Sequence, residues 1–528
     1  MILTFSFSIR AQDAPRLERF LGISSHQKPA PPLPALQGLL DHVAGGKLVL
    51  TLDDSVRLAL SNNTDIRLDH SQIDFAQNNL HRVRGPFDPL VTSSFADNRA
   101  KSPAITSIQG APVPDTLSQT TSFGYSQTFQ TGTNFQTFFS TNKLSTNDSL
   151  SLVNPSLASD LQFTLTQPLL RNFGLFPNRA PILIAQRNLH QARAVFQGEV
   201  NDIILQTVGS YWNVVLARES LTVQRKSLEE AQKSYDHDKK ALSLGALPPL
   251  DIYRSESQVA SRRVGVIQSE YALKQAEDQF RQVIGADLDP AIRVLDLELT
   301  DRTEPLGDLL STDIATTLTR ALANRPELEA AREQLTNDEL SIRLAHNHLK
   351  PDLELSGFYS GNGLGGNNTT AGNTGLGTSL SQVFHFTFPA YGASLSLNLP
   401  IKNHSAEANL ADAAVSRGRD QYQQRRTTQN ITLEVTNAVH ALEQAKLSME
   451  ASKVALDLAE KSLHADERKY ELGAETVFFV LDAQTQLAQA ELNLVQAQVN
   501  FQIAVAQVDH ATGDLMEHHH VEIKETSR

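Results

Sequence analysis

Histidine clusters are the residues of this chain whose chemistry could bind a metal. His518, His519 and His520 are adjacent near the C-terminus, and His346 and His348 lie two positions apart in a helical stretch. Positions two apart face different sides of a helix, so the second pair is a poor metal site. The three adjacent histidines are expected in a disordered tail. The sequence therefore predicts no metal site.

No other pattern indicates an enzyme. The sequence contains no P-loop, HExxH, GxSxG or CxxC pattern, which are the common arrangements for phosphate binding, zinc hydrolysis, serine nucleophiles and thiol chemistry. It also has no cysteine, which excludes a disulfide scaffold, a thiolate metal site and a cysteine nucleophile. We predict no catalytic residue and no cofactor.

The composition favours a long or tubular protein over one thick globule. Hydrophobic residues make up 40% and aromatic residues 6% of the 528 residues, which is low for a large packed core. The net charge of -13 argues against a nucleic-acid partner, because such a partner needs a basic surface. No window of about 18 apolar residues predicts a transmembrane helix. The first 15 residues are too short and too polar for a full secretory signal.

The chain is organised around two helical stretches of equal length. Gly473–Gly513 carries apolar residues at helical spacing, and the pattern returns between Gly245 and Gly285. Both stretches are entered through a Leu-Gly-Ala turn, and glycine just past a helix end commonly reverses the chain. A helix of fixed length is therefore used twice.

The remaining elements repeat in the same order, which predicts two internal repeats. The first unit, 49–290, begins with a helix. Strands at 87–170, a long helix at 178–243, a turn at 244–250 and a shorter helix at 251–285 follow it. The second unit, 313–515, also begins with a helix. Strands at 351–401, a long helix at 405–471, a turn at 472–476 and a shorter helix at 477–512 follow it. Three segments lie outside the units: a Pro-rich leader at 1–48, a connector at 291–312 and a polar tail at 516–528.

The strand regions alternate apolar and polar residues. Leu161, Phe163 and Leu165 alternate with polar side chains, and residues 384–388 alternate in the same way, with a flexible polar loop expected over 361–382. Strands of about ten residues with one apolar face are typical of a transmembrane β-barrel wall. A soluble sandwich gives the same alternation, so the strands alone leave both open.

The helices favour the barrel interpretation. The two long helices, each on the order of 100 Å, have no sheet to pack on and must pack on one another. One chain has too few strands to close a barrel without edges, so copies must associate. We predict a mainly α protein with transmembrane β structure, in which a long α-helical barrel continues into a β-barrel completed by several chains.

At this point the sequence resembles the TolC-like outer-membrane efflux proteins, from about Leu50 to Leu515. The resemblance is carried by LTLDDSVRLALSNN, by LTQPLLRNFG, by the two Leu-Gly-Ala turns, and by VLDAQTQLAQAELNLVQAQ followed by ATGDL. It implies a homotrimer with four strands per chain in a twelve-stranded outer-membrane barrel, and a periplasmic helical tunnel. It also implies a signal peptide upstream of Met1 or already trimmed.

The function implied by the resemblance is that of a passive exit duct in a tripartite efflux or type I secretion system. The implied partners are a periplasmic adaptor protein, an inner-membrane pump and outer-membrane lipid. The alternative is a periplasmic coiled-coil adaptor or scaffold without a pore. Such a protein would not need strands with a lipid-facing side.

The resemblance also implies a gate at the periplasmic end. Asp482 matches the position of an inner ring of carboxylates, which would repel one another and attract cations. Phe479, beside Phe478, stands where a second acidic ring is usual, which suggests a partly hydrophobic constriction. Asp251 and Tyr470 match residues whose hydrogen bonds hold the end closed.

The two turns are the expected contact with the adaptor, because exposed apolar tips often mark partner surfaces. The candidate contact residues are Leu244, Gly245, Ala246, Leu472, Gly473 and Ala474. A further hairpin is expected near 121–140, turning at Thr131 and Gly132. It exceeds the two strands per half of the resembled family, and one interpretation is an extracellular extension.

Overall fold

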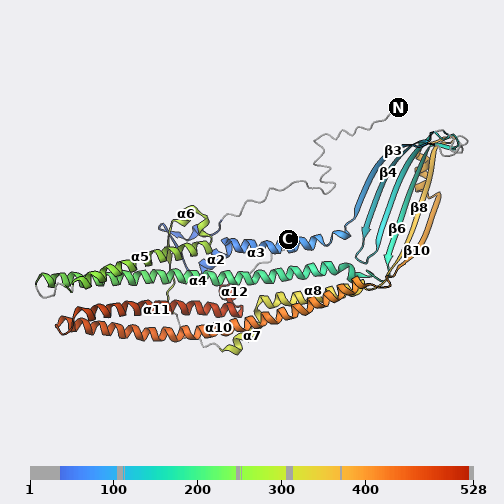
Figure 1. The fold of residues 1–528 in the computed structure, drawn as a ribbon. Coiled ribbons are helices and arrows are strands. Elements are labelled where there is room, and N and C mark those ends of the chain that lie inside the picture. The colour runs from blue at the N-terminus through green and yellow to red at the C-terminus, as the bar shows by residue number, and fades with distance from the viewer. Residues whose placement is uncertain are drawn as a thin grey trace.

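The computed structural model describes residues 36–103, 111, 113–244, 250, 252–304, 313–368 and 372–521. Figure 1 shows an elongated molecule in which long helices extend away from a sheet of strands at one end. Three of the candidate site residues, Gly245, Ala246 and Asp251, lie outside the described residues. So do most of the Pro-rich leader, part of the connector and the last residues of the tail, at 1–35, 305–312 and 522–528.

Two very long helices set the length of the molecule. α4 (Leu175–Ser243) has 69 residues and α10 (His404–Glu471) has 68, so each spans about 100 Å at 1.5 Å per residue. A shorter helix runs back along each of them, α5 (Ile252–Val283) along α4 and α11 (Val477–Thr512) along α10. The stretches expected from the sequence were 178–243 and 405–471 for the long helices, and 251–285 and 477–512 for the shorter ones.

The helix before each strand region is divided in two. α2 (Leu52–Asn62) is followed by α3 (Thr64–Arg82), and α7 (Ile314–Asn324) by α8 (Pro326–His348). At the first break, the Asn63 side chain caps α3 by accepting a hydrogen bond from the backbone N–H of Asp65 at 2.8 Å. At the sheet end, α3, α4, α8 and α10 lie side by side in that order (Figure 1).

Six long strands form one antiparallel sheet in the order β10-β8-β6-β5-β4-β3. The strands are β3 (Leu90–Lys101), β4 (Asp115–Thr128), β5 (Asn134–Thr146), β6 (Val153–Pro168), β8 (Asp352–Asn368) and β10 (Phe388–Asn398). Short β9 (Gly372–Thr374) pairs only with the end of β8. The expectation of four strands per chain is therefore wrong.

The additional hairpin consists of β4 and β5, which occupy the middle of this sheet. Its turn lies where expected, since the backbone N–H of Gly132 donates to the carbonyl of Phe129 at 2.9 Å. The turn sits at the helix end of the sheet, where the N–H of Gly174 donates to the carbonyl of Thr131 at 3.3 Å. The interpretation of this hairpin as an extracellular extension is wrong, because its strands pair with β3 and β6 along their length.

The second strand region differs from the sequence-based expectation at its far end. β8 continues to Asn368, and the expected strand around Phe384 is instead the end of a short helix, α9 (Leu376–Phe384). α9 packs on the sheet, where the hydroxyl of Ser379 donates to that of Ser159 at 2.8 Å. A side chain at Gly363 of β8 would clash with the Ser379 carbonyl, so glycine makes this close approach possible.

A small three-stranded sheet lies outside the large one. β2 (Lys47–Leu50) pairs with β1 (Val43–Ala44) and, in parallel, with β7 (Asp296–Leu299) of the connector. Leu48 and Leu50 are fully buried. The predicted leader is therefore ordered from residue 36 onwards, and a 3-10 helix (Leu39–His42) and α6 (Pro290–Arg293) flank this sheet.

The beginning of the tail is also ordered, contrary to expectation. α12 (Leu515–His518) follows α11, and Leu515 is buried. The Nδ1 atom of His518 lies 2.8 Å from a carboxylate oxygen of Asp509, and that of His519 lies 3.0 Å from Asp53. These histidines bind the helices beside them rather than one another.

Candidate functional site

The free end of the helices carries the candidate gate and tip residues. The second turn is built by a glycine: Gly473 has a φ of 73°, and the N–H of Ala474 donates to the carbonyl of Lys469 at 2.9 Å. This left-handed residue after α10 is the usual way to end a helix and reverse the chain. Leu472 is 76% exposed beside it, as expected of a contact residue. In the first turn Leu244 is similarly exposed.

Tyr470 joins the two helical hairpins. Its hydroxyl donates to a carboxylate oxygen of Asp238 in α4 at 3.0 Å, and the same carboxylate accepts a hydrogen bond from Ser255 of α5. The Tyr470 ring also lies edge-on to the ring of His237. Asp238 is fully buried, so these donors supply the hydrogen bonds that water would otherwise give its carboxylate. The expected hydrogen bond of Tyr470 across the hairpins therefore has Asp238 as its partner.

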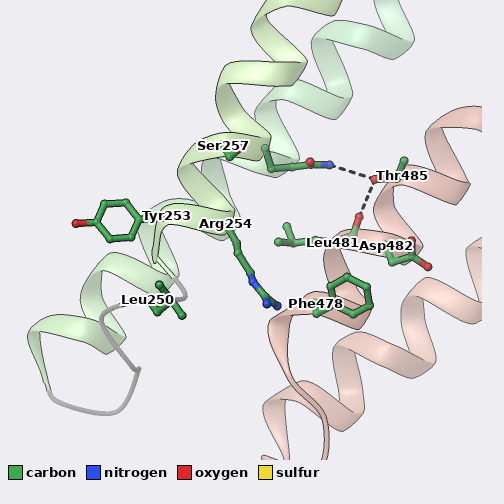
Figure 2. A pocket seen from close by; sticks show the side chains of 9 residues that line it. Leu250, Tyr253, Arg254, Ser257, Phe478, Leu481, Asp482 and Thr485 are labelled. Carbon is green, nitrogen blue, oxygen red and sulfur yellow. Dashed lines mark hydrogen bonds between the residues drawn. The ribbon is translucent and has the colours of Figure 1, made fainter.

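Phe478 and Phe479 begin α11 and are about half exposed. Their rings meet edge to face, with centroids 5.5 Å apart. The Arg254 guanidinium of α5 lies over the Phe478 ring, 6.0 Å from its centroid. Figure 2 shows Arg254 reaching across from α5 toward Phe478, above the second turn. The aromatic pair therefore borders the gap between the hairpins, and one of its faces is occupied by a cation.

Asp482 lies one turn further along α11. It is exposed, and its carboxylate accepts a hydrogen bond from the Gln486 amide at 2.7 Å. In Figure 2 its carboxylate points away from α5, whereas Leu481 points toward it. The carboxylate is therefore available to groups outside this chain.

Thr485 fastens α11 to α5. Its hydroxyl accepts hydrogen bonds from Arg262 at 2.6 Å and from Gln258 at 3.1 Å, and donates to the carbonyl of Leu481 at 2.8 Å. Burial lowers the pKa of Arg262. Between the two helices lies a cavity of about 610 Å³, whose walls include Leu250, Tyr253 and Ser257.

The sequence analysis missed Asp238, Ser255, Arg254 and Arg262. One signal was available for Asp238, which lies seven residues after the buried Ala231 and so continues the packed seam of α4 as a polar residue. The others lie on a helix whose charged residues resemble an ordinary solvated surface. The partners of Arg254 and Arg262 are in α11, far away in sequence, and the partner of Ser255 is Asp238 of α4. Only the folded chain identifies these contacts.

Among the described residues, no group of three or more His, Cys, Asp or Glu side chains could hold a metal ion. Within the same residues, no helix has a stretch that is both long enough and apolar enough to span a bilayer.

The family model "Outer membrane efflux protein" matches residues 56–286 and 317–514, which is most of the chain. The chain belongs to the outer membrane efflux protein family. The family is one of transport proteins, not of enzymes. Its matched residues include α4, α5, α10, α11 and the six-stranded sheet, so both the helices and the strands described above belong to the family fold.

Individual relatives are distant. The chain is 25% identical over 337 residues to outer membrane protein TolC of Escherichia coli, an alignment that covers 61% of this chain and 63% of that relative. It is 23% identical to TolC of Vibrio cholerae, over 63% of this chain and 72% of the relative. The chain therefore spans less than two thirds of the length of the Escherichia coli protein.

Solved structures share the fold. A membrane protein from Pseudomonas aeruginosa superposes with a TM-score of 0.65 at 18% identity, covering 88% of this chain and 93% of that one. CusC superposes with a TM-score of 0.63 at 17% identity, covering 92% and 98%. At these identities the likeness concerns the fold alone.

Proposed function

We propose that this chain is the outer-membrane channel of a tripartite efflux or type I secretion system. Three copies form one tube, with the sheets in the outer membrane and the helices in the periplasm. The tube is a passive conduit from the periplasm to the exterior. An inner-membrane pump supplies the energy, and a periplasmic adaptor protein connects the pump to the tube.

The two-faced sheet is the observation that carries this proposal. One row across all six strands reads Val91, Tyr125, Thr137, Phe163, Tyr359 and Tyr391. A row three positions further along the strands, on the other face, reads Ser94, Ser122, Ser140, Asp160, Asn362 and Phe388. Val91 is 71% and Tyr391 77% exposed in the single chain. An exposed aromatic face opposite a polar face fits a wall between lipid and water. A scaffold without a pore would have no use for it.

The exposed side of α10 supports association with a sister chain. Six large apolar residues lie along one stripe of this helix at spacings of 4, 7, 11 and 14 residues, all on the side away from α8 and α11: Val415, Tyr422, Leu433, Leu447, Val454 and Leu458. Such spacings keep a seam on one helix face, as in a coiled coil. A second copy of the chain is the natural partner, because its own helices run in the same direction.

The free end of the helices is proposed as the gate. In a trimer, the exposed carboxylate of Asp482 gives a ring of three, and Phe478 and Phe479 form an aromatic constriction beside it. The hydrogen bond from Tyr470 to Asp238 holds the second hairpin against the first. Opening requires these hairpins to separate, so polar bonds at this end resist opening while the apolar seams further along remain packed.

The exposed turns are proposed as the adaptor contact. Leu472 and Leu244 give each hairpin an apolar tip, and Gly473 and Ala474 add no bulky side chain that would obstruct a partner. The first tip also includes Gly245 and Ala246. The Asp251 position belongs to the same end and is proposed to contribute to closure.

Detergent extraction followed by mass measurement and planar-bilayer recording tests the proposal. We expect a trimer that forms cation-selective pores of low conductance, and an increase in conductance in Asp482→Ala. The control is Asp457→Ala, which removes an exposed carboxylate of α10 that is already paired with Lys461. A monomeric, water-soluble product without conductance would overturn the proposal.

A further inference from the structure

The edges of the large sheet and the number of its strands determine what kind of barrel this chain builds. We infer that three copies, joined β3 to β10, close a barrel of eighteen strands, wider than a barrel with four strands per chain. This inference rests on the proposed trimeric channel and concerns its outer-membrane part. The partner is a second copy of this chain, and the interaction surface is the pair of free strand edges.

The two edge strands match. β3 has 12 residues and β10 has 11, and neither has a partner on its outer side among the described residues. All neighbours in the sheet are antiparallel, and the number of strands is even. β3 of one copy and β10 of the next therefore run in opposite directions. The antiparallel alternation continues across the junction, which an odd number of strands would not allow.

The hairpin of β4 and β5 has the faces of a barrel wall. Phe123 and Tyr125 lie on the same face as Leu161 and Phe163 of β6, and the serines of β4 lie on the opposite face. An extension standing in water would need no continuous apolar side. The extra strands are therefore built for the same lipid and water environments as the rest of the sheet.

The lower turn of this hairpin is fixed to the helices. Gly132 has a φ of 88°, and a side chain there would come within 2.7 Å of the Asn172 carbonyl and 2.9 Å of the Asn178 amide. These two residues lie in the loop and first turn that lead into α4. The hairpin thus starts at the junction with the helical layer, at the same level as the other strands.

The width of the sheet matches the width of the helical layer. α3, α4, α8 and α10 lie side by side, and helices packed about 10 Å apart give a layer about 40 Å wide. Six strands spaced about 4.8 Å apart and tilted by about 40° cover about 38 Å, whereas four would cover about 25 Å. With six strands the β-barrel continues the helical tunnel at almost the same circumference, so little taper is needed.

A wider barrel changes which cargo can leave. By the same spacing and tilt, eighteen strands enclose a ring about 36 Å across the backbone, compared with about 24 Å for twelve. The outer-membrane part would then admit large or bulky cargo, and selection would fall on the narrow helical end.

Cysteine pairs test the strand order directly, because the natural chain has no cysteine. Ser94→Cys on β3 is combined with a cysteine at each position of β10 that lies on the Ser94 face of the sheet, which are Phe388, Ala390, Gly392, Ser394, Ser396 and Asn398. Cross-linking in isolated membranes uses a thiol reagent too short to span two strand spacings, about 10 Å. Because strand register can shift only by two residues without exchanging faces, one of these pairs must lie opposite Ser94.

Matched pairs separate the possible outcomes. We expect covalent trimers when Ser94→Cys is paired with the β10 cysteines, and none when Ser140→Cys on β5 replaces Ser94→Cys. Two pairs on neighbouring strands should form bridges within one chain: Ser94→Cys with Ser122→Cys, and Ser140→Cys with Asp160→Cys. Trimers formed by Ser140→Cys, or missing bridges within the chain, would overturn the eighteen-stranded barrel but leave the channel intact. A monomer with no cross-link between chains would overturn both.

Discussion

The two long helices, α4 and α10, are almost equal in length but differ in how much of their surface is buried. α4 lies between other elements and packs against α2, α3, α5, α8 and α11, whereas α10 packs on α7, α8 and α11 and is open on the other side. Many more residues of α4 are buried than of α10. The fold of one chain therefore depends on α4, while one side of α10 is left uncovered by the other described residues.

The difference also concerns the type of residue. The core around α4 contains Tyr211, Trp212 and Phe280, whose rings pack edge to face at 5.5 Å and 5.9 Å from the Tyr211 centroid. The core around α10 is mainly aliphatic, with residues such as Val435 and Ala438 and the ring of Phe501. Large rings fill the irregular space where several elements meet, and small residues suit a close helix pair.

Tyr211→Ala in α4 should have the largest effect. The side chain is fully buried, and its hydroxyl donates to Asp301 at 2.5 Å, so the cavity and the lost hydrogen bond should cost about 3–5 kcal/mol. Trp212 is the only tryptophan and its ring lies against that of Tyr211, so its fluorescence reports unfolding at this position. The control is Tyr422→Ala on the open side of α10. Equal losses for both variants would contradict the contrast between the helices.

Tyr422→Lys should weaken association more than folding. Tyr422 is 75% exposed in the single chain, and covering an apolar side chain of this kind contributes about 1.5–3 kcal/mol per copy. We expect mass measurement to detect dissociation of the proposed trimer at low concentration, with little change in helix content. Gln423→Lys, one residue further around the helix, serves as the control. An intact trimer in the Tyr422 variant would show that this side of α10 faces something else.

A pH-dependent contact connects both long helices through α11. Burial alone would lower the pKa of His510, but hydrogen bonds to Asp202 of α4 and Glu434 of α10 outweigh it and raise that pKa to about 9. Burial would raise the pKa of Glu434, yet hydrogen bonds from His510 and Arg325 lower it to about 2. The charged forms of both groups are therefore the ones that stabilise the fold at neutral pH.

The melting temperature should fall as pH rises through 9. Protonated His510 contributes its full stability below its unfolded pKa of 6.5 and loses it as pH rises through about 9, a loss on the order of 1–2 kcal/mol. Glu434 contributes above its unfolded pKa of 4.5 and loses that contribution as pH falls through about 2. His510→Gln should remove the alkaline decline, which thermal melts between pH 6 and pH 10 would measure. A decline that persists in this variant must come from other groups.

Tyr470→Phe should have the smallest effect on stability and a clear effect on opening. It removes the direct hydrogen bond between α10 and α4 but keeps the ring against His237, and Ser255 still donates to Asp238, so the loss should be about 1 kcal/mol. We expect bilayer recordings to detect more frequent opening. Ser255→Ala is the matched control, because it leaves the bond between the two hairpins in place. Similar opening in both variants would argue against a closing role for Tyr470.

Much of the helical structure could be read from local sequence. The long helices and the turn at Gly473 depend on residues close together in the chain, which is why helical periodicity and a glycine after a helix could predict them. The prediction of a strand around Phe384 is wrong. Its alternating phenylalanines are typical of a strand, but the segment ends the helix α9. What decides for a helix there is the row of glycines in β8, which lets α9 approach the sheet.

By itself the sequence determined the helices, the alternating faces of the strands and the family, because periodicity and turn residues act over a few positions along the chain. Only the tertiary structure decided that β4 and β5 belong to the sheet wall, and that Tyr470 bonds Asp238. These depend on which strand or helix becomes the neighbour of another. Strand pairing and buried hydrogen bonds join residues that are distant in the chain, and a two-faced strand or an isolated aspartate carries no local mark of its partner.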